Sequence, residues 1–84
     1  MTARETEILE RVRGLMQATL QLSDAEAAAV NRASTPATVA GWTSMAHLDL
    51  VLAVEKQFDV VFDADEIAHL ASLDAIVAAL LKRP

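Results

Sequence analysis

Residues 41–58 read GWTSMAHLDLVLAVEKQF, and this stretch decides the fold class. A polar approach containing a glycine gives way at Thr43 or Ser44 to apolar residues at helical spacing. This pattern predicts a helix that runs to about Gln57. The residues expected on its inward stripe are Met45, Leu48, Val51, Leu52 and Phe58.

The chain before this stretch predicts one long helix and one short helical stretch. Apolar residues within 3–20 recur at spacings of four and three, which is typical of an amphipathic helix. Ser23 is a candidate N-cap for a short helical stretch over residues 24–30. We expect Val39 and Trp42 to hold the long connection that follows to the core. The apolar stripe of the first helix is expected to comprise Ile8, Val12, Leu15, Thr19 and Leu22.

The chain after residue 58 predicts a loop and two further helices. Residues 59–65 alternate like a strand, but a lone strand would have no partner, so we expect a packed loop. Asp63 or Asp65 is expected to cap a short helix over residues 66–70, and Ser72 to cap the last helix. The inward residues of that last helix are expected to be Leu73, Ile76, Val77, Leu80 and Leu81.

Three longer helices and one short one predict an all-α fold, a small four-helix bundle, with residues 1–84 as a single domain. The chain has no cysteine, which excludes disulfides, thiolate metal sites and a cysteine nucleophile. No apolar run approaches the roughly 20 residues that cross a bilayer. The N-terminus lacks the pattern of a signal peptide. We therefore expect no membrane association and a cytoplasmic protein.

The net charge of −5 is concentrated in residues 49–74, which carry seven acidic side chains and one basic side chain. An acidic surface repels the phosphates of nucleic acids and favours basic protein partners. The sequence alone leaves open that these charges only keep a helical surface solvated.

The residues that could form an enzyme or metal site have unsuitable spacing. Ser44, His47 and Asp49 are the residue types of a catalytic triad, but Asp49 lies two residues beyond His47 and points elsewhere on a helix. The acidic run from Asp59 has no glycine at its sixth position, as a calcium-binding loop requires. We therefore expect no catalytic residues and no metal site.

Ser44 is the remaining candidate, with two readings. Serine is a common helix N-cap, although neither Thr43 nor Ser44 has the acidic or amide residue three positions on that completes a capping box. A hydroxyl at a helix N-terminus is also exposed near backbone N–H groups that favour an anion. A phosphodiester on this oxygen would be well placed.

Residues 41–81 resemble the carrier-protein family, which comprises acyl carrier proteins and peptidyl carrier domains. The family's Asp-Ser-Leu attachment motif opens the second helix of a four-helix bundle, and here it reads Thr43-Ser44-Met45. Residues 65–81 match the third and fourth helices of the family, and residues 3–40 match by helix pattern. After the attachment motif, the family has a helix that continues into the run Glu-x-x-Phe-x-Val-x-Phe. The residues here that match this helix and run are Leu48, Val51, Glu55, Phe58, Val60 and Phe62.

The resemblance implies that Ser44 accepts 4′-phosphopantetheine from coenzyme A through a phosphopantetheinyl transferase. The arm would carry acyl or aminoacyl groups as thioesters, and the protein would have no catalysis of its own. Acyltransferase, ligase or synthase enzymes would dock through basic patches. The partner-interface residues that the resemblance implies are Thr43, Met45, Asp49, Glu55, Asp63 and Glu66.

Thr43 stands where acyl carrier proteins usually have aspartate, which favours modification by a broad-specificity transferase. Together with the modest acidity of the second helix, this indicates a discrete carrier in polyketide or related secondary-metabolite biosynthesis. We expect a free-standing monomer. The alternatives are an acyl carrier protein of fatty-acid synthesis and an unmodified, carrier-like interaction module in which Ser44 only caps a helix.

Overall fold

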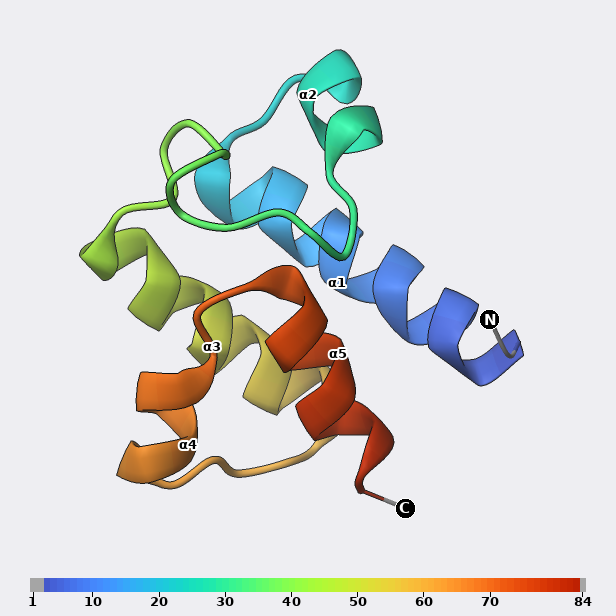
Figure 1. Cartoon of the computed structure of the whole chain (residues 1–84), viewed down its shortest axis with the longest axis vertical. Helices are drawn as coiled ribbons and strands as arrows, with labels where there is room; N and C mark the ends of the chain where they lie inside the picture. Colours follow the sequence, from blue (N-terminus) through green and yellow to red (C-terminus); the bar gives the residue numbers. More distant parts are fainter. Residues whose placement is uncertain (1–2, 84) are drawn as a thin grey trace.

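The structure of the protein, a computed structural model, describes residues 3–83. The ends of the predicted domain, residues 1–2 and 84, lie outside them. The described residues form five helices and no strand, so the predicted all-α fold is confirmed (Figure 1). The helices are α1 (Ala3–Leu20), α2 (Asp24–Ala29), α3 (Ser44–Phe58), α4 (Ala64–His69) and α5 (Leu73–Leu81).

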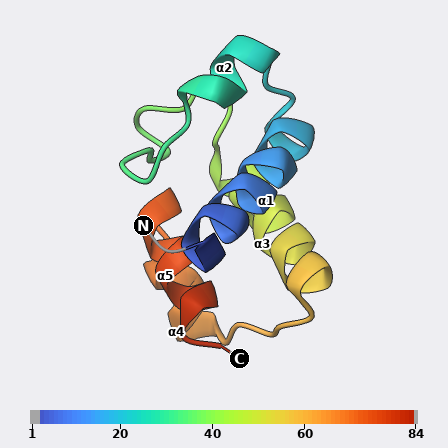
Figure 2. The same cartoon turned by 90° about the vertical axis from the view of Figure 1, so that its right-hand side faces the viewer.

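The long helix α1 is the centre of the fold and packs against α2, α3 and α5. Figure 2 shows α1 and α3 crossing in the middle, with α2 at one end of the molecule and α4 at the other. The predicted stripe is confirmed at Ile8 and Val12, which are buried, while Leu15 is partly buried against the core. Met16 adds a fully buried side chain to the same face. Leu22 is buried too, but it lies beyond the end of α1 at Leu20.

Side-chain caps fix where the short helices begin. Ser23 caps α2 through a reciprocal capping box with Glu26, as its candidate role predicted. Asp63, not Asp65, caps α4 in a second capping box with Glu66. These boxes satisfy N–H groups that the first turn of a helix leaves free, which matters most in helices of six residues.

The last helix matches its sequence prediction. The Ser72 hydroxyl accepts a hydrogen bond from the Ala75 N–H at 3.1 Å and caps α5. Four of its five predicted inward residues are buried, and Leu81 is partly buried against the core. The buried residues are Leu73, Ile76, Val77 and Leu80.

The predicted inward stripe of α3 is wrong for three of its five residues. Met45, Leu48 and Leu52 are exposed, with 79%, 55% and 63% of their surface accessible. The side chains of Leu50 and Val54, four residues apart, face the core instead. The predictions for Val51, which is buried, and Phe58, which is partly buried, are confirmed. Apolar residues surround most of this helix, so the spacing rule fits more than one face. Packing against α1 selects the face.

The long connection over residues 30–43 is fixed to the helices at both of its ends. Near its start, the Leu73 N–H donates to the Ser34 carbonyl at 2.9 Å, and the Arg32 guanidinium pairs with Asp74 at 2.7 Å. Near its end, Trp42 is buried and Val39 is partly buried against the core, which confirms both predicted anchors. The connection therefore delivers the chain to a defined start of α3.

The segment between α3 and α4 is a packed loop, as predicted. Phe62 is buried, and its backbone N–H donates to the Glu55 carboxylate at 2.7 Å. The Arg83 guanidinium lies over the Phe62 ring at 4.6 Å. The loop therefore obtains its order from side chains of α3 and of the chain end rather than from a strand partner.

Arginines of α1 hold the C-terminal ends of the other two longer helices. Arg11 donates to the Gln57 carbonyl at 3.1 Å and stacks 4.2 Å from the centre of the Phe58 ring. Arg4 donates to carbonyls at the end of α5, including that of Leu81 at 3.3 Å. Because the last carbonyls of a helix lack partners within it, these contacts stabilise both ends. Within residues 3–83, no helix has the length and apolar character needed to cross a membrane.

Candidate functional site

Ser44 is the first residue of α3, and it does not cap the helix. The cap is Thr43, whose hydroxyl oxygen accepts a hydrogen bond from the Ala46 N–H at 3.2 Å. The Thr43 carbonyl accepts the His47 N–H at 2.8 Å and begins the helical ladder. Ser44 is exposed, and the structure places no described residue in hydrogen-bond contact with its hydroxyl. This oxygen is therefore free for chemistry with another molecule.

The start of α3 differs in charge from the starts of the other helices. Its first turn carries no acidic side chain, whereas each of the other four has at least one. The positive end of the helix dipole is therefore not neutralised by a carboxylate at this position. Such an end is electrostatically suited to an anion attached at Ser44.

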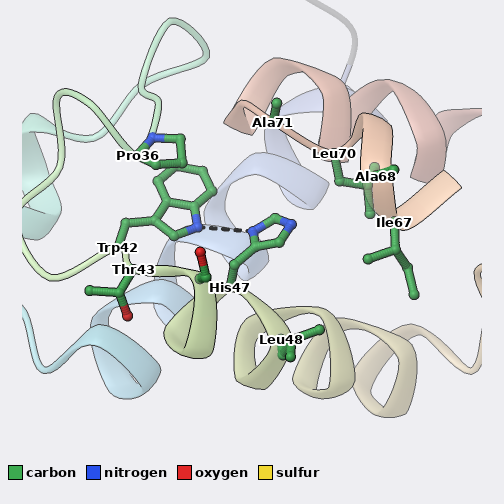
Figure 3. Close-up of a pocket in the computed structure, with 10 residues that line it drawn as sticks. Pro36, Trp42, Thr43, His47, Leu48, Ile67, Ala68, Leu70 and Ala71 are labelled. Carbon is green, nitrogen blue, oxygen red and sulfur yellow. Dashed lines mark hydrogen bonds between the residues drawn. The ribbon is translucent and has the colours of Figure 1, made fainter. Parts of the chain in front are cut away.

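A groove of about 610 Å³ opens between the first turn of α3 and helix α4, and we call it the Ser44 groove. Figure 3 shows Trp42 and Pro36 on one side of it, Ile67 and Leu70 on the other, and Leu48 along α3. Its polar lining consists of Thr43, Ser44 and His47, all at the start of α3. The Ser44 hydroxyl oxygen thus borders a groove whose walls are mainly apolar.

Trp42 and His47 form a hydrogen-bonded pair at this groove (Figure 3). The indole Nε1–H of Trp42 donates to Nδ1 of His47 at 3.0 Å, and the ring centres lie 5.9 Å apart. Because indole N–H is only a donor, Nδ1 must be the unprotonated nitrogen of the imidazole. The neutral ring then carries its proton on Nε2, the nitrogen on the far side of the ring from Trp42.

The structure does not assemble Ser44, His47 and Asp49 into a triad. The ring nitrogen that a triad carboxylate would hold is taken by Trp42. Asp49 lies on the exposed side of α3, two residues after His47. Among residues 3–83, no three histidine or acidic side chains gather as metal ligands, and Asp63 and Glu66 of the acidic run after α3 are engaged in capping α4.

The six residues predicted for a partner interface separate into two groups. Thr43 caps α3, and Met45 and Asp49 lie in its first two turns, so all three are close to Ser44 along the chain, and all three are exposed. Glu55 lies eleven residues after Ser44 on α3, which places it about 16 Å from Ser44 along the helix axis. The structure therefore does not place all six residues in one cluster around Ser44.

The other three residues, Glu55, Asp63 and Glu66, are carboxylates with internal partners. Glu55 accepts the Phe62 N–H at 2.7 Å, and Asp63 caps α4. Glu66 completes that capping box and pairs with Arg83 at 2.8 Å. Internal pairing reduces the charge that they present to a partner, which sequence composition does not show.

Sequence reasoning missed two kinds of residue at this site. The sequence predicts Leu48 and Leu52 in the core, but both are exposed and extend the apolar surface that begins at Met45. The sequence gives the spacing of three and four among these residues, but it does not show whether their face of the helix points to the core or to solvent. The Trp42–His47 pair was also missed, although the two residues lie only five positions apart along the chain. Comparison with protein-family models and with curated protein sequences gave no match to this chain.

Proposed function

We propose that the protein is an acyl carrier protein that bears 4′-phosphopantetheine on Ser44 and carries acyl or aminoacyl groups as thioesters. The observation that carries the proposal is the Ser44 hydroxyl, which is exposed at the start of α3 and released from capping by Thr43. The absence of acidic side chains in the first turn suits a phosphodiester at this oxygen. The resemblance of residues 41–81 to carrier proteins supports the same assignment.

In this proposal α1, α3, α4 and α5 take the places of the four bundle helices, and α2 belongs to the long connection. The Ser44 oxygen attacks the phosphorus next to the pantetheine in coenzyme A, in the active site of a phosphopantetheinyl transferase. A new oxygen–phosphorus bond forms, the bond to adenosine 3′,5′-bisphosphate breaks, and the hydroxyl proton passes to a base of the transferase. The arm's thiol then carries the cargo, and the carrier contributes recognition rather than catalysis.

The surface near Ser44 favours a discrete carrier in polyketide or related biosynthesis over a fatty-acid carrier. Asp49 is the only carboxylate in the first two turns of α3. Met45 and Leu48 lie near it and are strongly exposed. Partner enzymes would therefore meet an apolar surface with one nearby charge, and the protein would serve them as a monomeric cytoplasmic shuttle.

The test is intact mass after incubation with coenzyme A, magnesium and a broad-specificity phosphopantetheinyl transferase. We expect the parent to gain one phosphopantetheine, Ser44→Ala to gain none, and Ser23→Ala to gain the same mass as the parent. Ser23 is the matched control because it is another exposed serine at a helix start. No gain in the parent, with a known carrier modified in the same tube, would contradict the proposal.

One observation favours a second candidate, a carrier-like module that only binds other proteins. Met45, Leu48 and Leu52 form a stripe at spacings of three and four on the exposed side of α3. A helix face of this pattern is a common way to enter an apolar groove of a partner. The mass experiment separates the candidates, because the interaction module needs no modification at Ser44.

A further inference from the structure

Three polar side chains line the Ser44 groove: Thr43, Ser44 and His47. His47 lies furthest along α3, one turn after Ser44. Its Nδ1 is occupied by Trp42, which is 3% exposed and therefore held firmly by the core. A buried donor of this kind fixes both the tautomer and the orientation of an imidazole. The Nε2–H is thus a hydrogen-bond donor with a set direction, facing away from Trp42.

The side chains that line the groove opposite His47 are apolar and offer that donor no acceptor. Ile67 and Leu70 come from the α4 side, and Leu48 comes from α3 (Figure 3). The structure places no described residue in hydrogen-bond contact with Nε2 of His47. A saturated chain lying in the groove would displace water from Nε2–H without replacing its hydrogen bond, which is unfavourable. A chain that bears an oxygen acceptor would replace it.

We infer that His47 is a specificity-determining residue that favours oxygen-bearing acyl chains, with keto or hydroxyl groups, over saturated ones. The inference rests on the proposed function, because the chain reaches the groove on an arm attached to Ser44. His47 donates its Nε2–H to the oxygen of the chain, and Trp42 keeps the ring in the tautomer that can donate. A site built around a hydrogen-bond donor discriminates by leaving that donor unpaired with the wrong ligand.

The experiment loads Ser44 with three hydrolysis-resistant pantetheine analogues and follows the exchange of the Trp42 Nε1–H with solvent by NMR. The analogues carry the bare arm, an octanoyl amide or a 3-oxooctanoyl amide. Trp42 is the only tryptophan, so its indole signal is unambiguous. We expect exchange to be about fivefold slower with the 3-oxooctanoyl group than with octanoyl, the ratio that one net hydrogen bond commonly gives.

Two variants separate specificity from a merely structural role. Glutamine at position 47 supplies both an acceptor for Trp42 and a donor for the chain, so His47→Gln is expected to keep the preference. His47→Phe fills similar space without either group, and its exchange rates with the two acyl groups are expected to be equal. Each ratio is taken within one variant, so a general change in stability cancels.

The outcomes distinguish the inference from the proposed function. Failure of the parent to gain mass with any analogue would overturn both. Full loading with equal exchange for octanoyl and 3-oxooctanoyl would overturn the role of His47 and leave the carrier function standing. Slow exchange already present with the bare arm would also overturn it, because the arm's own amides would then be the acceptor.

Discussion

The Thr43 hydroxyl accepts the backbone N–H of Ala46 and thereby caps α3. Two adjacent residues at the start of this helix could have served as the cap, and the structure assigns the task to the first. Ser44 then begins the helix with an exposed, unengaged hydroxyl. The two hydroxyls thus differ by one hydrogen bond: that of Thr43 holds the start of the helix, and that of Ser44 is available to another molecule.

This difference predicts unequal effects on stability for two neighbouring substitutions. Thr43→Ala removes the cap and should lower the free energy of unfolding by about 1 kcal/mol, the usual effect of losing an N-cap. Ser44→Ala should change it by less than about 0.5 kcal/mol, as exposed positions without a partner do. Urea titrations followed by the fluorescence of Trp42 measure both. A larger loss for Ser44→Ala would show that Ser44 has a structural partner.

The orientation of α3 predicts a contrast between two of its leucines. Leu50 is fully buried, so Leu50→Ala should lower the free energy of unfolding by about 2–5 kcal/mol. Leu48 is largely exposed, so Leu48→Ala should cost less than about 0.5 kcal/mol. Thermal and urea unfolding of the two variants side by side provide the measurement. Similar losses at both positions would contradict this orientation of the helix.

Elements that depend on local signals were predictable from the sequence. The bounds of α1 follow from its long apolar repeat, and the starts of α2 and α5 follow from Ser23 and Ser72. A cap acts through the next three residues, so the information lies within one turn of the chain. The all-α class follows from the same local patterns.

The facing of α3 and the pairing of its side chains were not predictable in this way. Leu48 and Leu50 are equally apolar, and only the packing of α3 against α1 decides which one is buried. In the sequence Glu55 resembles a surface charge, yet its carboxylate lies 2.7 Å from the backbone nitrogen of Phe62. These relationships depend on the path of a loop, which composition and spacing do not encode.

Glu55 is therefore expected to matter for stability more than for partner binding. Its half-buried carboxylate accepts the Phe62 N–H, and hydrogen bonds to charged groups are stronger than average. Glu55→Ala should lower the free energy of unfolding by about 1–2 kcal/mol. Asp49→Ala, an exposed carboxylate on the same helix, is the control and should be close to neutral.

Experiments with a partner enzyme test the exposed carboxylate of Asp49. Charge reversal at Asp49 alone should slow loading by an enzyme with a basic docking patch, because complementary charge mainly speeds encounter. The comparison is the rate of mass gain for Asp49→Lys and the parent at low and high salt. Equal rates at low salt would remove this part of α3 from the interface.

The capping box of α2 predicts a specific response to acid. Hydrogen bonds from the backbone and side chain of Ser23 to the Glu26 carboxylate lower the pKa of Glu26 below its ordinary value. The native state then holds this proton less readily than the unfolded chain does. The stabilisation is therefore fully present above the ordinary carboxyl pKa and is lost as the pH falls through the lowered native pKa of Glu26.

Glu26→Gln tests this response, since glutamine keeps a neutral acceptor for the box but does not titrate. The stability advantage of the parent over Glu26→Gln should be largest near neutral pH and should shrink steadily in acid. Urea unfolding from neutral pH to strongly acidic pH measures the difference, with Asp49→Asn as the control for an exposed carboxylate outside a capping box. An advantage that stays constant with pH would show that the charge of Glu26 does not contribute to the start of α2.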